Sequence, residues 1–396
     1  DACRSARISQ RPDGTVLLLP DAELQPYPDR LTDRLEEWAA AVPDRVFVAQ
    51  RRGGGQWEPI TYAQMRDRAR AIGQALLARG LSTERPIAIL SENGLEHLML
   101  ALGAMWVGVP FAPVSPAYSL ISKDFGKLRH ILARTTPGLV FASGAAYSAA
   151  IAATVDETVE VVMTHPDASL GREVTPLQLL RDTPAGAEVD AAHERVGPET
   201  IVKFLFTSGS TKLPKGVINT HRMLCANQQM IRQAMAFLAD EPPVLVDWLP
   251  WNHTFGGNHN VGITLYNGGT LYIDEGRPVP GQIDRTLANL REIATTAYFN
   301  VPRGFEVLLP ALRADDAFRE HFFSRLQALF FAAAGLRPEI ADGMQELAIA
   351  TRGAPVPWIT GLGATESAPF ALCTGALLST TTHVGVPVPG LELKVA

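Results

Sequence analysis

The stretch Thr207-Ser208-Gly209-Ser210-Thr211-Lys212-Leu213-Pro214-Lys215-Gly216 carries the strongest local signal in the chain. It follows an apolar run over 201–206, which predicts a strand, and it precedes a second expected strand over 217–219. A helix is expected from Thr220, a favourable N-cap residue. Hydroxyls and glycine offer many small donors to an anion, and Lys215 adds a positive charge suited to phosphate. The sequence therefore predicts a phosphate-binding loop that joins two strands.

Two positions separate this loop from the P-loop of nucleoside triphosphatases. That signature requires glycine where this chain has Pro214, and serine or threonine where it has Gly216. The P-loop also opens directly onto a helix, whereas this loop is expected to connect strands. From composition alone, an ordinary hairpin loop rich in serine, threonine and glycine is an equally good interpretation.

Strand-like and helical segments alternate on both sides of the loop. Helical patterns cover 31–41, 62–79 and 95–107, and short apolar strands cover 46–50 and 87–90. This order is typical of an α/β fold in which helices flank mostly parallel sheets. We expect two α/β halves that meet at the polar stretch 187–200, followed by the start of a small β-barrel part. The expected bounds are 1–199, 200–383 and 384–396.

The composition supports a large folded core and excludes several classes of partner. Of the 396 residues, 46% are apolar and 19% are charged, and the net charge is −6, which disfavours nucleic acid as a partner. The apolar stretch 98–114 is interrupted by glycine and proline, so it is not expected to span or bind a membrane. The cysteines Cys3, Cys225 and Cys373 show no zinc-site spacing, and their scarcity favours a reducing compartment. A cytoplasmic protein is expected.

Two further segments bear residues suited to chemistry. His253 lies in Leu249-Pro250-Trp251-Asn252-His253-Thr254-Phe255-Gly256-Gly257, and His259 follows six residues later without a nearby cysteine or acid, which argues against a zinc site. The second segment is Gly361-Leu362-Gly363-Ala364-Thr365-Glu366, which breaks the dinucleotide fingerprint because Glu366 replaces its third glycine. A phosphate-binding oxidoreductase is therefore disfavoured. Taken singly, His253 is more often a structural histidine and Glu366 a solvated acid.

Together these segments resemble the adenylate-forming (ANL) acyl-CoA synthetase superfamily. The loop from Thr207 resembles its T-S-G-[ST]-T-G-x-P-K-G motif, with Lys212 where the family has glycine, and the segment from Gly361 resembles its G-[YL]-G-x-T-E motif. Two other family segments occur in order, as Phe331-Ala332-Ala333-Ala334-Gly335-Leu336 and as Val384-Gly385-Val386-Pro387-Val388-Pro389-Gly390. The run 247–260 is most similar to bacterial feruloyl-CoA synthetases, which act in the breakdown of plant aromatic acids.

The resemblance implies a reaction and a set of roles. ATP and a carboxylic acid would form an acyl-adenylate and pyrophosphate, and coenzyme A would then displace AMP to give a thioester. His253, Thr365, Glu366 and Lys215 would be catalytic, and Glu366 would hold Mg²⁺. The phosphates would lie against Thr207, Ser208, Gly209, Ser210, Thr211, Lys212 and Lys215. Adenine would lie against Ala334, Gly335, Leu336, Gly361, Leu362 and Gly363. The acid would lie against His253, Phe255, Asn258, His259, Tyr298, Val301 and Ala333.

The resemblance also implies what this chain is and which acid it takes. It is expected to be the large N-terminal domain of a synthetase, without the mobile C-terminal domain, and alone to fail at thioester formation. A hydroxycinnamic acid such as ferulate is the expected substrate, and a homodimer is expected from family habit. Benzoate, a medium-chain fatty acid, or a nucleotide-binding module without catalysis are the alternatives.

Overall fold

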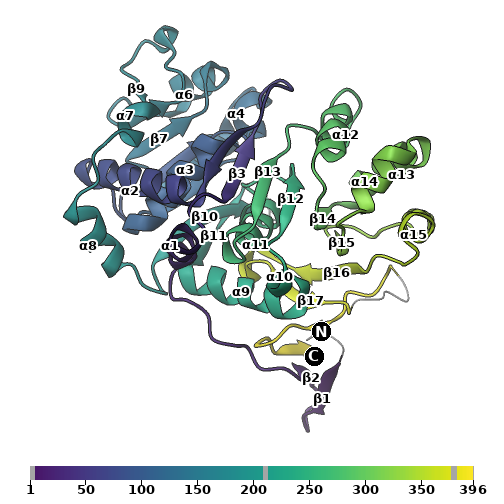
Figure 1. Ribbon diagram of the computed structural model, residues 1–396. Helices are drawn as coiled ribbons and strands as arrows, with labels where there is room; N and C mark the ends of the chain where they lie inside the picture. The colour runs from purple at the N-terminus through teal and green to yellow at the C-terminus, as the bar shows by residue number, and fades with distance from the viewer. Residues whose placement is uncertain (1–4, 208–212, 376–380, 396) are drawn as a thin grey trace.

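The computed structural model describes residues 5–207, 213–375 and 381–395. The largest sheet has the strand order β11-β10-β6-β5-β7-β8-β9, and its strands run parallel except that β10 and β11 form an antiparallel hairpin (Figure 1). Its strands are β5 (Ile87–Leu90), β6 (Phe111–Pro113), β7 (Leu139–Ala142), β8 (Glu160–Met163), β9 (Thr175–Pro176), β10 (Ile201–Thr207) and β11 (Lys215–Thr220). The hairpin agrees with the prediction of a loop between two strands.

Two further sheets complete the body of the molecule. The second has the order β12-β13-β3-β4 and the third β14-β15-β16-β17-β18, and in each the first three strands are parallel. The second sheet comprises β3 (Val46–Gln50), β4 (Glu58–Thr61), β12 (Val244–Asp247) and β13 (Thr270–Ile273). The third comprises β14 (Ala297–Asn300), β15 (Ala328–Phe331), β16 (Trp358–Gly363), β17 (Phe370–Cys373) and β18 (Val386–Pro387). The expected α/β fold with mostly parallel sheets is confirmed.

The expected division of the chain into 1–199 and 200–383 does not follow these sheets. Strands β10 and β11 extend the sheet of the first half, while β3 and β4 pair with β13 of the second half. The polar stretch expected to separate the halves contains helix α8 (Ala187–Arg195), which buries Val189 and Ala192. Backbone pairing joins strands that are far apart in sequence, so a local change in polarity does not mark the boundary.

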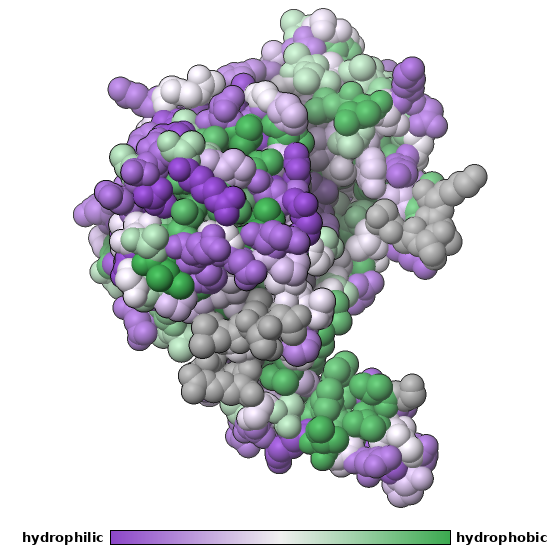
Figure 2. All heavy atoms as spheres, turned by 90° about the vertical axis from the view of Figure 1, so that its right-hand side faces the viewer, coloured by the Kyte–Doolittle hydropathy of each residue, from purple (hydrophilic) through white to green (hydrophobic). Residues whose placement is uncertain are grey.

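A small sheet of both chain ends projects from the body. It consists of β1 (Ala6–Gln10), β2 (Val16–Pro20) and β19 (Leu393–Val395), in the order β1-β2-β19. It forms the protruding lobe at the bottom of Figure 2, where hydrophobic residues lie on its surface. The expected separate part over 384–396 is thus built jointly with N-terminal strands.

Helices cover the faces of the sheets, and their apolar residues form the core. Helices α1 and α3 and strands β3 and β5 have the expected bounds, and α2 ends one residue before the expected limit. In the described parts of the chain, no helix is both long enough and apolar enough to cross a membrane. The helices are α1 (Leu31–Ala41), α2 (Tyr62–Ala78), α3 (Leu95–Val107), α4 (Ala117–Leu120), α5 (Gly126–Thr135), α6 (Ser148–Thr154), α7 (Leu177–Arg181), α8, α9 (His221–Ala234), α10 (Phe237–Asp240), α11 (Val261–Tyr266), α12 (Ile283–Glu292), α13 (Pro302–Ala314), α14 (Asp316–Phe323) and α15 (Pro338–Arg352).

Candidate active site

The β10–β11 hairpin presents the two described ends of the predicted phosphate loop. Thr207 pairs with Lys215 at the loop end of the hairpin, and the Lys215 side chain is exposed. Thr220 caps the following helix α9 as expected, because its side chain accepts a hydrogen bond from the Met223 amide. Ser208, Gly209, Ser210, Thr211 and Lys212 lie outside the described residues, so their contact with phosphate stays a prediction.

A pocket of about 640 Å³ brings together three segments that are far apart in the sequence. Ten of the predicted acid-binding and adenine-binding residues line it. They are His253, Phe255, His259, Ala333, Ala334, Gly335, Leu336, Gly361, Leu362 and Gly363. A second pocket, of about 380 Å³ near Glu92 and Arg277, contains none of the predicted site residues. The geometry therefore favours the first pocket as the reaction site.

His253 lies two residues before the π-helix η3 (Phe255–Asn260), and its side chain is exposed. Its Nδ1 accepts a 3.2 Å hydrogen bond from the Phe255 amide, so in the neutral imidazole the proton sits on Nε2. Desolvation lowers the pKa of His253, which favours that neutral form. His253 Nε2 is thus a donor suited to a carboxylate oxygen.

Glycines allow this turn to pack tightly. A Cβ atom at Gly257 would lie 2.2 Å from the Trp251 carbonyl oxygen, and one at Gly256 would lie 2.3 Å from that of Leu249. Both distances are far below van der Waals contact, so any larger residue would push the η3 backbone away from the 249–251 loop.

His259 lies deeper in the pocket, among four phenylalanine rings. Its side chain is 1% exposed, and burial lowers its pKa to about 4, so it is neutral at pH 7. The surrounding rings, which we call the phenyl cage, have centroids 5.2–5.6 Å from the His259 ring and belong to Phe255, Phe299, Phe330 and Phe370. Phe330 and Phe370 were not among the predicted site residues, although each lies in a short apolar strand beside a predicted segment.

Three residues predicted to contact the acid lie elsewhere. Tyr298 packs in a separate core with Phe305 and Phe322, and its hydroxyl accepts a 2.9 Å hydrogen bond from Asn300 Nδ2. Successive residues of a strand face opposite sides, so the neighbouring Phe299 contacts His259 instead. Val301 caps helix α13 and packs against the main core. Neither Tyr298 nor Val301 lines the pocket.

Asn258 is also a structural residue, not a pocket residue. It is buried, and its Nδ2 donates to Asn219 Oδ1 at 2.8 Å and to Thr254 Oγ1 at 3.1 Å. Asn219 in turn donates through Nδ2 to the Thr365 carbonyl at 3.4 Å. This asparagine pair joins η3 to the turn that carries Glu366.

Thr365 and Glu366 occupy the 3₁₀ turn η4 (Thr365–Ser367), between the pocket-lining residues Gly363 and Pro369. Thr365 is buried and Glu366 is exposed. A single accessible carboxylate suits Mg²⁺, which usually takes one or two protein carboxylates together with phosphate oxygens and water. The residues present therefore fit the predicted metal role of Glu366.

Asn227 holds the far end of this turn, and sequence reasoning did not find it. Its Nδ2 donates to the Phe370 carbonyl at 2.8 Å and to the Ser367 carbonyl at 3.1 Å, while its Oδ1 accepts from the Phe370 amide at 3.1 Å. A single asparagine in an amphipathic helix does not indicate that its side chain will bond to a backbone more than one hundred residues away. Asn219 was missed for the same reason.

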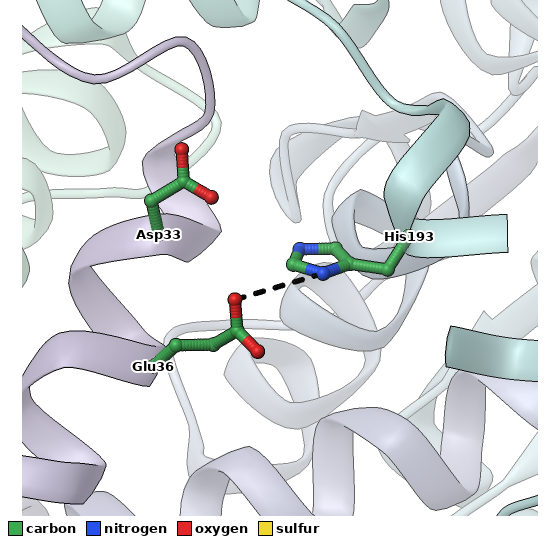
Figure 3. A group of neighbouring side chains, drawn as sticks. All are labelled: Asp33, Glu36 and His193. Atoms are coloured by element: carbon green, nitrogen blue, oxygen red, sulfur yellow. Dashed lines mark ion pairs between the residues drawn. The ribbon is translucent and has the colours of Figure 1, made fainter. Parts of the chain in front are cut away.

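A group of possible metal ligands outside the pocket has a structural explanation. Asp33, Glu36 and His193 gather where α1 meets α8, with His193 Nδ1 3.7 Å from Glu36 Oε2 (Figure 3). Asp33 already pairs with Arg30 at 2.7 Å, His193 Nε2 lies 2.9 Å from Thr32 Oγ1, and the imidazole stacks on Trp106. The neighbouring guanidinium disfavours a cation, so this group ties α8 to α1.

Comparison with known proteins places this architecture in a family. A family model described as AMP-binding enzyme matches residues 35–396. The chain is 26% identical over 351 residues to a methyl-dioxo-octahydroindenyl-propanoyl:CoA ligase of Rhodococcus jostii, a match that covers 85% of this chain and 64% of that protein. The chain therefore spans less than two thirds of the length of that relative.

Solved structures share the fold. A long-chain-fatty-acid-CoA ligase from Archaeoglobus fulgidus aligns with a TM-score of 0.73 at 18% identity, over 93% of this chain and 71% of that one. A benzoate CoA ligase from Burkholderia xenovorans aligns with a TM-score of 0.73 at 21% identity, over 91% of this chain and 66% of that one. Because the family model matches nearly the whole chain, the protein belongs to the AMP-binding family of adenylate-forming enzymes.

Proposed function

We propose that this protein activates a carboxylic acid with ATP, forming an acyl-adenylate that coenzyme A converts into a thioester. The observation that carries the proposal is the single pocket that combines His253 and three rings of the phenyl cage with the segments 333–336 and 361–363; the three rings are those of Phe255, Phe330 and Phe370. The turn with Glu366 adjoins this pocket, and Asn219 on the phosphate hairpin contacts that turn. This arrangement supports a site for an acid next to a site for a nucleotide.

In the proposed first step, a carboxylate oxygen attacks the α-phosphorus of ATP, and the bond to the β-phosphate oxygen breaks to release pyrophosphate. The thiol of coenzyme A then attacks the acyl carbon, AMP leaves with the carbon–oxygen electron pair, and the thiol loses its proton. Holding two anionic reactants in line is worth roughly 7–11 kcal/mol of the barrier. No covalent nucleophile is needed from the protein.

The chain's own residues have positioning and charge-stabilising roles in this proposal. His253 Nε2 orients the attacking carboxylate, and Lys215 and the hydroxyls from Thr207 onward bind the triphosphate. Thr365 lies at the α-phosphate, and Glu366 holds Mg²⁺, which neutralises phosphate charge when bound. Adenine would lie against Leu362, which is 54% exposed, and against the residues 333–336, which line the same pocket.

For the acid we propose an aromatic compound of the hydroxycinnamate class, with ferulate as the first candidate. Support comes from the phenyl cage, whose rings offer flat walls to an aryl group, and from the small residues Ala332, Ala333 and Ala334 along the same pocket. A flexible fatty chain gains less from aromatic faces, so benzoate is the nearer alternative and a medium-chain fatty acid the more distant one.

Calorimetry on the chain tests the proposal. We expect ferulate to bind more tightly in the presence of an ATP analogue that cannot be cleaved between the α- and β-phosphates, and the analogue to gain the same factor from ferulate. Benzoate and octanoate measured in the same way rank the alternatives. Nucleotide binding that no acid affects would instead indicate a binding module without catalysis.

A further inference from the structure

One nitrogen at the pocket has no protein partner. His259 lines the pocket, and its Nδ1 lies 2.8 Å from Asn260 Oδ1. Within the described residues, Nε2 is buried and has no hydrogen bond. The four rings of the phenyl cage cannot act as hydrogen-bond partners of Nε2, because phenyl groups lack polar atoms. A buried polar atom without a partner is unfavourable, so a ligand that satisfies it gains affinity.

The neighbours of His259 decide what kind of partner Nε2 requires. Asn260 Oδ1 can only accept, so the proton of the neutral imidazole sits on Nδ1 and Nε2 carries the lone pair. Burial raises the pKa of the Asp247 carboxyl and the nearby Asn260 amide partly offsets this rise, although Asn260 Nδ2 makes no hydrogen bond within the described residues. The contact of Nδ1 with Asn260 Oδ1 thus makes Nε2 an acceptor.

The two pocket histidines therefore have opposite polarity. His253, at the exposed end of η3, presents an N–H donor, whereas His259, at the buried end, presents an acceptor. Six residues at about 1.5 Å each separate them by about 9 Å or less along the helix axis. This pairing suits a rigid molecule with a carboxylate at one end and a hydroxyl at the other.

Resting on the function proposed above, we infer that His259 Nε2 accepts a hydrogen bond from a ring hydroxyl of the acid. His259 is then a specificity-determining residue that selects hydroxyaryl acids over unsubstituted and O-methylated ones at the same ring position. Selection arises because a ligand without the hydroxyl leaves the buried nitrogen unpaired, and a methoxy group offers only a second acceptor.

The first test uses the unaltered chain and a ligand series, so it does not depend on any variant folding. Calorimetry with the non-cleavable ATP analogue compares 4-hydroxycinnamate with cinnamate and with 4-methoxycinnamate, and 4-hydroxybenzoate with benzoate. We expect the hydroxyl to tighten binding about tenfold in at least one pair, as an ordinary buried hydrogen bond would. Equal binding in all three comparisons overturns the inference but leaves the proposed function standing, whereas the absence of binding by every acid removes both.

The second test assigns the preference to His259. His259→Phe keeps a flat ring and removes the acceptor, and His259→Gln places an amide oxygen near the position of Nε2. We expect the preference to fall below twofold in the phenylalanine variant and to survive in the glutamine variant. A preference that persists in His259→Phe, with thermal unfolding showing a folded protein, contradicts the assignment.

Discussion

Asn258 Nδ2 donates a 2.8 Å hydrogen bond to Asn219 Oδ1, and this bond connects the π-helix of the acid pocket to strand β11 of the phosphate hairpin. Both side chains are buried, and Asn219 continues the connection to the Thr365 carbonyl. The segment that carries His253 and the turn that carries Glu366 are therefore fixed relative to each other through one pair of amides. In our proposal, reactants bound by these two segments are therefore held in a fixed position relative to each other.

Replacing either asparagine should destabilise the protein, and the two effects should not add. Asn219→Ala and Asn258→Ala each leave a buried partner unsatisfied, so each should lower the free energy of unfolding by about 1–3 kcal/mol. The double variant should lose less than the sum, with a coupling of roughly 0.5–3 kcal/mol. Urea unfolding of the four proteins measures this cycle, with Asn252→Ala as a half-buried control from the same loop. Strict additivity would show that the amides do not act together.

Tyr298 and Phe299 provide a matched test of which strand face meets the acid. Phe299→Leu removes one ring of the phenyl cage, so it should weaken binding of an aryl acid by up to about tenfold. Tyr298→Phe should leave that binding unchanged, while the loss of the acceptor for Asn300 lowers stability by about 1–3 kcal/mol. Calorimetry and thermal unfolding of both variants separate the two outcomes. Equal weakening of acid binding in the two variants would place Tyr298 in the pocket after all.

Patterns that are local in sequence predicted much of the fold and the outline of the site. The apolar runs and Thr220 were enough for the β10–β11 hairpin and helix α9, and three predicted segments do meet at one pocket. Strand β14 is buried on both faces, so alternation could not tell which of Tyr298 and Phe299 contacts His259. The sequence pattern also gave no indication of the π-helical turn. This turn directs Asn258 toward β11 and places His259 in the lining of the pocket. Sheet pairing of β3 with β13 depends on contacts more than two hundred residues apart.

Lys203 predicts an unusual dependence of stability on pH. It lies on β10 with 3% exposure, its Nζ donates to the Gly257 carbonyl at 3.3 Å, and within the described chain it has no ion pair with a carboxylate. Burial lowers the pKa of Lys203 to about 7, and nearby His97, whose pKa falls to about 4, stays neutral over the range considered. Between about pH 7 and 10.5 the unfolded chain thus binds more protons at this lysine than the folded one, so stability rises with pH.

Lys203→Met should remove this dependence. Relative to the variant, the wild-type free energy of unfolding should rise by up to about 1.4 kcal/mol per pH unit between pH 7 and 10. At pH 6–7 the methionine variant should be the more stable protein, because it buries no charge. Urea unfolding at intervals of half a pH unit measures the difference between the two curves. Parallel curves would mean that Lys203 stays charged in the folded state.

His253 should act on the reaction itself more than on binding. Its Nε2–H is positioned by the Phe255 amide and projects from an exposed side chain, so in our proposal it meets the carboxylate as that group attacks phosphorus. Removing one such donor typically costs about 10²–10³ in rate, and we expect His253→Ala to lower kcat for acid-dependent ATP–pyrophosphate exchange by that factor with a smaller change in KM.

His253→Asn keeps an N–H donor and should recover part of the loss, and His165→Ala, at an exposed histidine outside the pocket, should have no effect. Because the lowered pKa of His253 makes it neutral at pH 7, its contribution should persist up to pH 8.5. A rate within twofold of wild type in His253→Ala would remove this histidine from the mechanism and leave the phosphate hairpin and Glu366 to align the reactants.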